Sequence, residues 1–136
     1  MSARQIGRPN AASQARLQLV LVALAIWNFL AYFLELTNTR FLEVHGIDGV
    51  LGARSSSGAL AVLAVAYLYA ARNPIRYRFI LWLAALEQFV ALFSYTFHWA
   101  RDDVGASEAL LPIIVAAGFL VLLLINMPRQ TDTIGL

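Results

Sequence analysis

The stretch FILWLAALEQFVALFSYTFHW, residues 79–99, decides the fold of this chain. As a helix with a rise of ~1.5 Å per residue it is about 30 Å long, which matches the hydrocarbon core of a bilayer. It holds one acidic residue, Glu87, and neither lysine nor arginine. The stretch therefore predicts a membrane-spanning helix. Glu87 lies ~12 Å into the membrane and is a candidate functional residue, because an ionisable group is costly at that depth.

The composition of the whole chain also indicates a membrane protein. Of its 136 residues, 60% are hydrophobic and only 13% are charged, whereas a soluble domain carries about a quarter charged residues. This balance excludes a soluble enzyme, a nucleic-acid-binding protein and a disordered chain. Cysteine is absent and all ten basic residues are arginine. The chain therefore has no ligand for a cysteine-bound metal and no lysine for covalent retinal or pyridoxal phosphate.

Three further apolar runs predict three further helices in a single transmembrane domain. The second run is fully apolar only from Gly58 to Ala71. That is about 21 Å of helix, so the helix must extend back through Arg54 to span the membrane. Ser107 is the expected N-cap of the last helix. We expect an all-α, four-helix membrane bundle with helices at about residues 17–36, 51–71, 79–99 and 108–127, after a polar tail of residues 1–16.

The arginine count on each side of the membrane predicts the orientation of the chain. Seven of the ten arginines fall in the two tails and in the loop between the second and third helices, and three fall on the opposite side. Because loops rich in arginine remain in the cytoplasm, both termini are expected to be cytoplasmic. The longer loop between the first two helices, residues 37–50, would then lie outside as a cap over the bundle.

Polar side chains follow one face of three predicted helices toward their outer ends. At 100° per residue, Ser94 and His98 point within about 20° of the direction of Glu87. The first helix carries a similar polar face, and the second contributes an arginine and three serines at the same level. If these faces converge, they form a blind pocket that opens to the outer side with Glu87 near its floor. The candidate pocket residues are Asn28, Tyr32, Glu35, Arg54, Glu87, Ser94 and His98.

Structural interpretations of the same residues remain open. Glu87 could be a protonated acid that is hydrogen-bonded to Asn28 or Gln88 and holds the helices in register. Glu35 and Arg54 could form an ion pair near the outer interface. In that case the polar faces stabilise the bundle and bind nothing.

The sequence identifies no cofactor or metal. His98 next to Trp99 at a helix end is typical of an interfacial anchor. Haem ligation by His45 and His98, or a pigment on His98 alone, has no further support. A dicarboxylate metal site would need a second acid in the middle of the membrane, and none is present. The tyrosines, Tyr67 among them, fit aromatic belts at the two membrane interfaces.

A resemblance to a known family rests on residues 51–58 (LGARSSSG), 70–76 (AARNPIR) and 81–83 (LWL). Over about residues 50–85 the chain resembles bacterial four-helix membrane proteins of the DoxX-like type. The resemblance implies a four-helix bundle in the bacterial inner membrane. It also implies structural roles for Arg54 and Gly58.

Three functions are compatible with these observations. The small size and the lack of a complete catalytic set favour a non-catalytic accessory or scaffold subunit of a larger membrane assembly. The second hypothesis is an enzyme or binding protein for a small lipophilic molecule, with Glu87 as acid/base or hydrogen-bond donor. The third is proton-coupled transport through Glu87, which is less favoured because the inner half of the chain offers no polar path. The expected partners are thus the lipid bilayer, other membrane subunits and a lipophilic ligand.

Overall fold

The computed structural model describes residues 11–37 and 50–128. Within these ranges the chain is all-helical, as predicted. Three of the helices are long and apolar enough to cross a membrane, and the second contributes a shorter apolar helix, Gly58–Ala71. The four helices are α1 (Ala11–Thr37), α2 (Val50–Ala71), α3 (Arg78–Ala100) and α4 (Ala106–Asn126).

Two helix boundaries differ from the expectation. The helix α1 begins at Ala11, so it includes six residues, 11–16, that were expected in the polar tail. This segment, AASQAR, is rich in residues with high helix propensity. The N-cap of α4 is Gly105, so the assignment of Ser107 was wrong. Glu108 explains the earlier start, because its carboxylate accepts a hydrogen bond from the Gly105 N–H at 3.1 Å.

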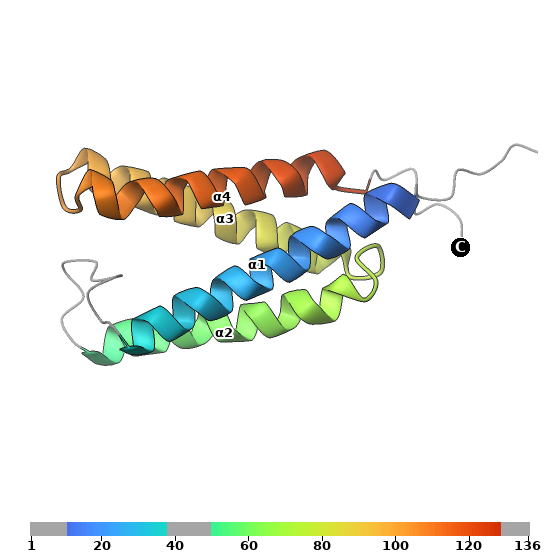
Figure 1. Cartoon of the computed structure of the whole chain (residues 1–136), viewed down its shortest axis with the longest axis horizontal. Coiled ribbons are helices and arrows are strands. Elements are labelled where there is room, and N and C mark those ends of the chain that lie inside the picture. Colours follow the sequence, from blue (N-terminus) through green and yellow to red (C-terminus); the bar gives the residue numbers. More distant parts are fainter. Residues whose placement is uncertain (1–10, 38–49, 129–136) are drawn as a thin grey trace, which may run out of the picture.

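The helices form two antiparallel hairpins, α1 with α2 and α3 with α4 (Figure 1). Contacts within each hairpin are more extensive than the contacts between hairpins, which run from α1 to α4 and from α2 to α3. The turn of residues 72–77 joins the hairpins. The α3–α4 turn contains Asp102 in the left-handed conformation, with φ 60°.

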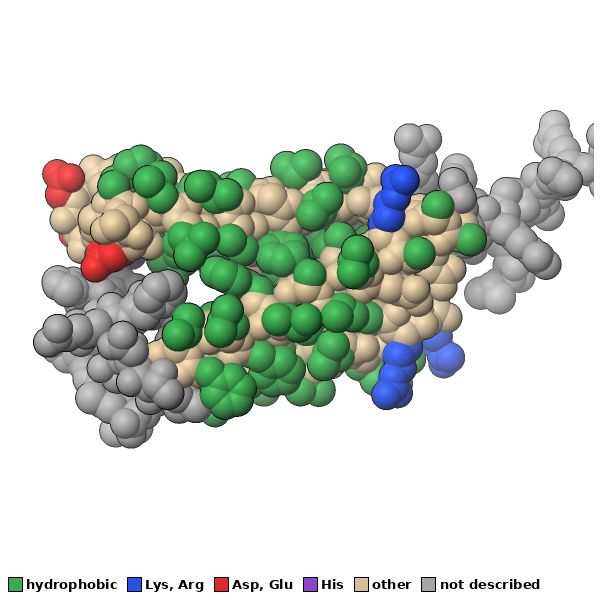
Figure 2. Space-filling model, in the orientation of Figure 1, with side chains coloured by type: hydrophobic (Ala, Val, Ile, Leu, Met, Phe, Trp, Pro, Cys, Tyr) green, Lys and Arg blue, Asp and Glu red, His purple; other side chains and the backbone are tan. Residues whose placement is uncertain are grey.

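The charged side chains of the described residues lie mainly at the two ends of the molecule. One end, called the arginine end below, contains Arg16, Arg72, Arg76 and Arg78; the opposite end, called the acidic end, contains Asp102, Asp103 and Glu108. Figure 2 shows arginines at one end, acidic side chains at the other and apolar side chains between them. This distribution fits a molecule whose middle lies in hydrocarbon and whose ends reach water.

The buried core lies in the half of the molecule nearer the arginine end. On α1 no described residue after Asn28 is buried, and on α3 none after Gln88. Toward the acidic end the two hairpins separate, and Figure 2 shows an opening between them. The main buried hydrophobic side chains are Leu17, Leu21, Leu24, Ala64, Tyr67, Leu81, Ala84 and Leu123.

Leu21→Ala is expected to lower the free energy of unfolding in detergent by about 2 kcal/mol, because the substitution leaves a cavity in this core. This cost is at the low end of the range for Leu→Ala substitutions in a core. Detergent also surrounds the leucine in the unfolded state, so the hydrophobic effect contributes less than it does in water. Leu21 is 0% exposed, whereas Leu19 on the same helix is 70% exposed and provides the control, Leu19→Ala. Unfolding monitored by circular dichroism should separate the two variants; equal losses would contradict this assignment of the core.

Candidate functional site

Glu87 on α3 is the centre of a hydrogen-bonded cluster that joins three helices. Its Oε1 accepts a hydrogen bond from Asn28 Nδ2 of α1 at 2.8 Å. Its Oε2 accepts from the Tyr67 hydroxyl of α2 at 2.5 Å and from Gln88 Nε2 at 3.1 Å. We call these four residues, Asn28, Tyr67, Glu87 and Gln88, the Glu87 cluster.

Small residues lie next to the interhelical polar residues of the cluster. A buried alanine precedes each of the interhelical polar residues by three positions, that is, by about one helical turn: Ala25 before Asn28, Ala64 before Tyr67 and Ala84 before Glu87. Small side chains at helix contacts bring the backbones close together in membrane proteins. The described parts of α1 and α3 are not in backbone contact, so the hydrogen bond between Asn28 and Glu87 is made possible by the length of the glutamate side chain.

The donors of the cluster are more deeply buried than the acceptor. Asn28, Tyr67 and Gln88 are 2%, 0% and 3% exposed, whereas Glu87 is half-buried. Among the described residues, no arginine or histidine forms an ion pair with Glu87. Three donors directed at two oxygens compensate the carboxyl group for the loss of water.

The prediction that Glu87 is hydrogen-bonded to Asn28 or Gln88 is confirmed, and both bonds are present. In each of them Glu87 is the acceptor, so they do not require a protonated acid. The cluster thus connects α1, α2 and α3 and contributes to the structure whatever else it does.

The sequence interpretation of Tyr67 was wrong. Tyr67 was expected in an aromatic belt at the membrane interface, but its side chain is fully buried within the helices and donates to Glu87. The signal that could have identified it is its position among alanines. Ala64 and Ala71, three residues before and four after it, mark the packed face of α2.

The remaining pocket candidates lie farther toward the acidic end or outside the described side chains. Tyr32 and Ser94 are half-buried, about one turn beyond Asn28 and two turns beyond Glu87 respectively. The side chains of Glu35 and Arg54 lie outside the described residues, so their proposed ion pair stays a prediction. The convergence of all the polar faces into one pocket also stays a prediction.

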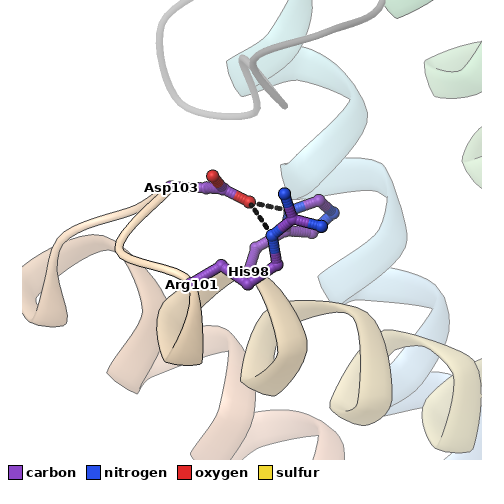
Figure 3. A network of polar contacts seen from close by, with 3 residues as sticks. All are labelled: His98, Arg101 and Asp103. Atoms are coloured by element: carbon purple, nitrogen blue, oxygen red, sulfur yellow. Dashed lines mark hydrogen bonds and ion pairs between the residues drawn. The ribbon is translucent and has the colours of Figure 1, made fainter.

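His98 belongs to a separate network at the acidic end (Figure 3). Its Nδ1 lies 3.0 Å from Asp103 Oδ2, which also lies 3.6 Å from Arg101 Nε. The Arg101 guanidinium lies over the Phe97 ring, 5.4 Å from its centroid. His98 follows Glu87 by eleven residues, about 16 Å along the helix. The structure therefore connects His98 with the α3–α4 turn, and within the part of the chain that the structure describes no hydrogen bond joins it to the Glu87 cluster.

No group of three or more His, Cys, Asp or Glu side chains with the arrangement of a metal site occurs among the described residues. His45, the second histidine considered for haem ligation, lies outside them. Nδ1 of His98 is already in hydrogen-bonding contact with Asp103.

Comparison of the chain with protein-family models, curated proteins and solved structures gives no significant match. The resemblance to the DoxX-like four-helix proteins therefore stays a prediction. The site is interpreted from its own geometry.

Tyr67→Phe is expected to lower the free energy of unfolding by about 1 kcal/mol, because the carboxylate loses one of its three donors while the aromatic ring remains. Glu87→Gln should cost at least as much, since the amide cannot accept all three bonds and turns its own NH₂ group toward other donors. Ser94→Ala, on the same face of α3, is the control and should unfold like the wild type. Equal stability of all four proteins would show that the cluster does not hold the helices together.

Proposed function

We propose that the chain is a small integral membrane protein that binds a lipophilic molecule bearing a hydrogen-bond donor at one end. In this proposal its four helices form a bundle that crosses the membrane, and the molecule enters between the two hairpins from the acidic end. The polar end of the molecule then contacts Glu87, while its apolar body remains in hydrocarbon.

The charge distribution supports the orientation. Arg16, Arg72, Arg76 and Arg78 all belong to the arginine end. Arginine-rich loops remain on the cytoplasmic side, so this end is the cytoplasmic one in the proposal, with both termini there. The opening between the hairpins then faces the outer side, and in a bacterium the membrane is the inner membrane.

The observation that carries the proposal is that Glu87 is only half-buried, whereas the three side chains that donate hydrogen bonds to it are more deeply buried. A carboxylate that served only to connect helices would be expected to be as buried as its partners. Oε2 accepts two hydrogen bonds and Oε1 accepts one, which leaves one acceptor position on Oε1. A ligand that fits this position donates a hydrogen bond, as an alcohol or an ammonium group does.

The helix faces that lead from the cluster toward the acidic end suit the apolar body of such a molecule. Leu60 and Leu63 precede Tyr67 by seven and four residues, so they lie on its face of α2 and are half-buried. Ala91 follows Glu87 by four residues on α3 and is half-buried too. Apolar walls around a few polar groups are typical of small-molecule sites.

The proposed role is binding, and the other two hypotheses receive less support from the geometry. Buried leucines, Leu21, Leu24 and Leu81 among them, fill the space between the Glu87 cluster and the arginine end. Such a layer does not favour a proton path to the cytoplasm. The role as an accessory subunit stays a prediction. It would be supported by a second membrane protein that copurifies with this chain in mild detergent.

A long-chain alcohol and its methyl ether provide the test, because only the alcohol carries a donor. Retention of each probe by the purified protein is measured by mass spectrometry of the intact complex. The wild type should retain the alcohol more than the ether, and Glu87→Gln should lose at least about tenfold of that preference, the equivalent of one hydrogen bond to a charged group.

Tyr67→Phe is the matched control for indirect damage, because it loosens the cluster but keeps the carboxylate. It should retain most of the preference for the alcohol. Equal retention of alcohol and ether by the wild type, or an unchanged preference in Glu87→Gln, would contradict the proposal.

A further inference from the structure

The turn between α2 and α3 carries a ladder of two arginines and two tyrosines at the arginine end. The Tyr69 and Tyr77 rings have centroids 4.9 Å apart, and the Tyr77 hydroxyl donates a hydrogen bond to the Tyr69 hydroxyl at 3.1 Å. The Arg72 guanidinium lies 5.7 Å from the Tyr69 ring centroid, and that of Arg76 lies 5.8 Å from the Tyr77 centroid. We call these four residues the Arg–Tyr ladder.

Backbone hydrogen bonds give the turn a defined shape. Asn73 Oδ1 accepts a hydrogen bond from the Arg76 N–H at 3.1 Å, and the Asn73 carbonyl accepts one from the Tyr77 N–H at 3.2 Å. Pro74, between them, is buried. The two arginines therefore extend from a fixed backbone, and each is restrained further by the ring beneath it.

The guanidinium groups of the ladder have no anionic partner among the described residues. The ion pairs found there are those of Asp103 with His98 and Arg101, at the opposite end of the molecule. Arg72 and Arg76 are exposed. A guanidinium placed over a ring keeps N–H groups that are free to bind an anion.

We propose that the Arg–Tyr ladder binds the phosphate of an anionic lipid in the leaflet that meets the arginine end. A guanidinium presents paired N–H groups that match two oxygens of a phosphate. The inference requires only that the turn lies at a membrane surface. It does not depend on a ligand at Glu87.

The apolar surroundings of the ladder identify the phosphate as that of a lipid. Leu68 and Phe79 flank the turn and are 41% and 77% exposed. Both belong to the apolar helices that the turn connects. A phosphate bound by the ladder therefore sits where acyl chains would lie along these side chains, and an inorganic phosphate gains nothing from them.

The test compares phosphatidylglycerol with phosphatidylcholine of the same acyl chains, each added to the delipidated full-length protein in detergent. Retained lipid is counted by mass spectrometry of the intact complex. The wild type should prefer phosphatidylglycerol, and the double variant Arg72→Gln/Arg76→Gln should lose at least about tenfold of this preference. Arg101→Gln, which removes a ring-stacked arginine at the other end, is the matched control and should behave as the wild type.

A second double variant, Arg72→Lys/Arg76→Lys, distinguishes recognition by the guanidinium groups from attraction by positive charge alone. It keeps both charges but loses the planar fork, so it should show a reduced preference for phosphatidylglycerol. Wild-type preference in this variant would overturn the proposal in favour of diffuse charge. Unchanged binding in the glutamine variant would also overturn it, as would displacement of the lipid by millimolar inorganic phosphate.

Discussion

The hydrogen bonds to Glu87 are the constraint on which the arrangement of the helices depends. Within an apolar environment, an ionised or polar side chain has a stable place only where donors meet it. Asn28, Tyr67 and Gln88 supply them from three helices. Buried alanines lie one turn away from the residues that make the interhelical bonds. Position and rotation of α1, α2 and α3 are therefore fixed together, and the leucine core packs on one side of that junction.

On the other side of the junction, the two hairpins no longer bury side chains of α1 and α3 between them. The described part of α1 after Asn28 and of α3 after Gln88 has no buried side chain. Over the molecule as described, contacts within each hairpin are more extensive than contacts between the hairpins. The polar network of His98, Arg101 and Asp103 stabilises the end of one hairpin without joining it to the other. Among the described residues, a closed half thus meets a half in which the hairpins are separate, and Glu87 lies at the boundary between them.

The helices and the importance of Glu87 could be predicted from the sequence because both follow from hydropathy along a single chain. Glu87 is conspicuous in an apolar run, and Asn28 is conspicuous in another. Tyr67 could not be identified in the same way. A tyrosine near a helix end has the same hydropathy whether it faces lipid or a neighbouring helix. The partner of His98 depended on the turn, in which Asp102 adopts a positive φ that brings Asp103 back toward α3. Hydropathy carries no information about that conformation.

The short α2–α3 turn has a mechanical consequence. It is the covalent link between the hairpins, and it lies at the end of the molecule opposite the opening. Together with the core and the Glu87 cluster, it holds the hairpins together at that end. A relative tilt of the hairpins therefore separates them only beyond Glu87. For the arm of ~20 Å from Glu87 to the end of α3 at Ala100, a rotation of about 5° moves the far ends apart by about 2 Å, while the arginine end hardly moves.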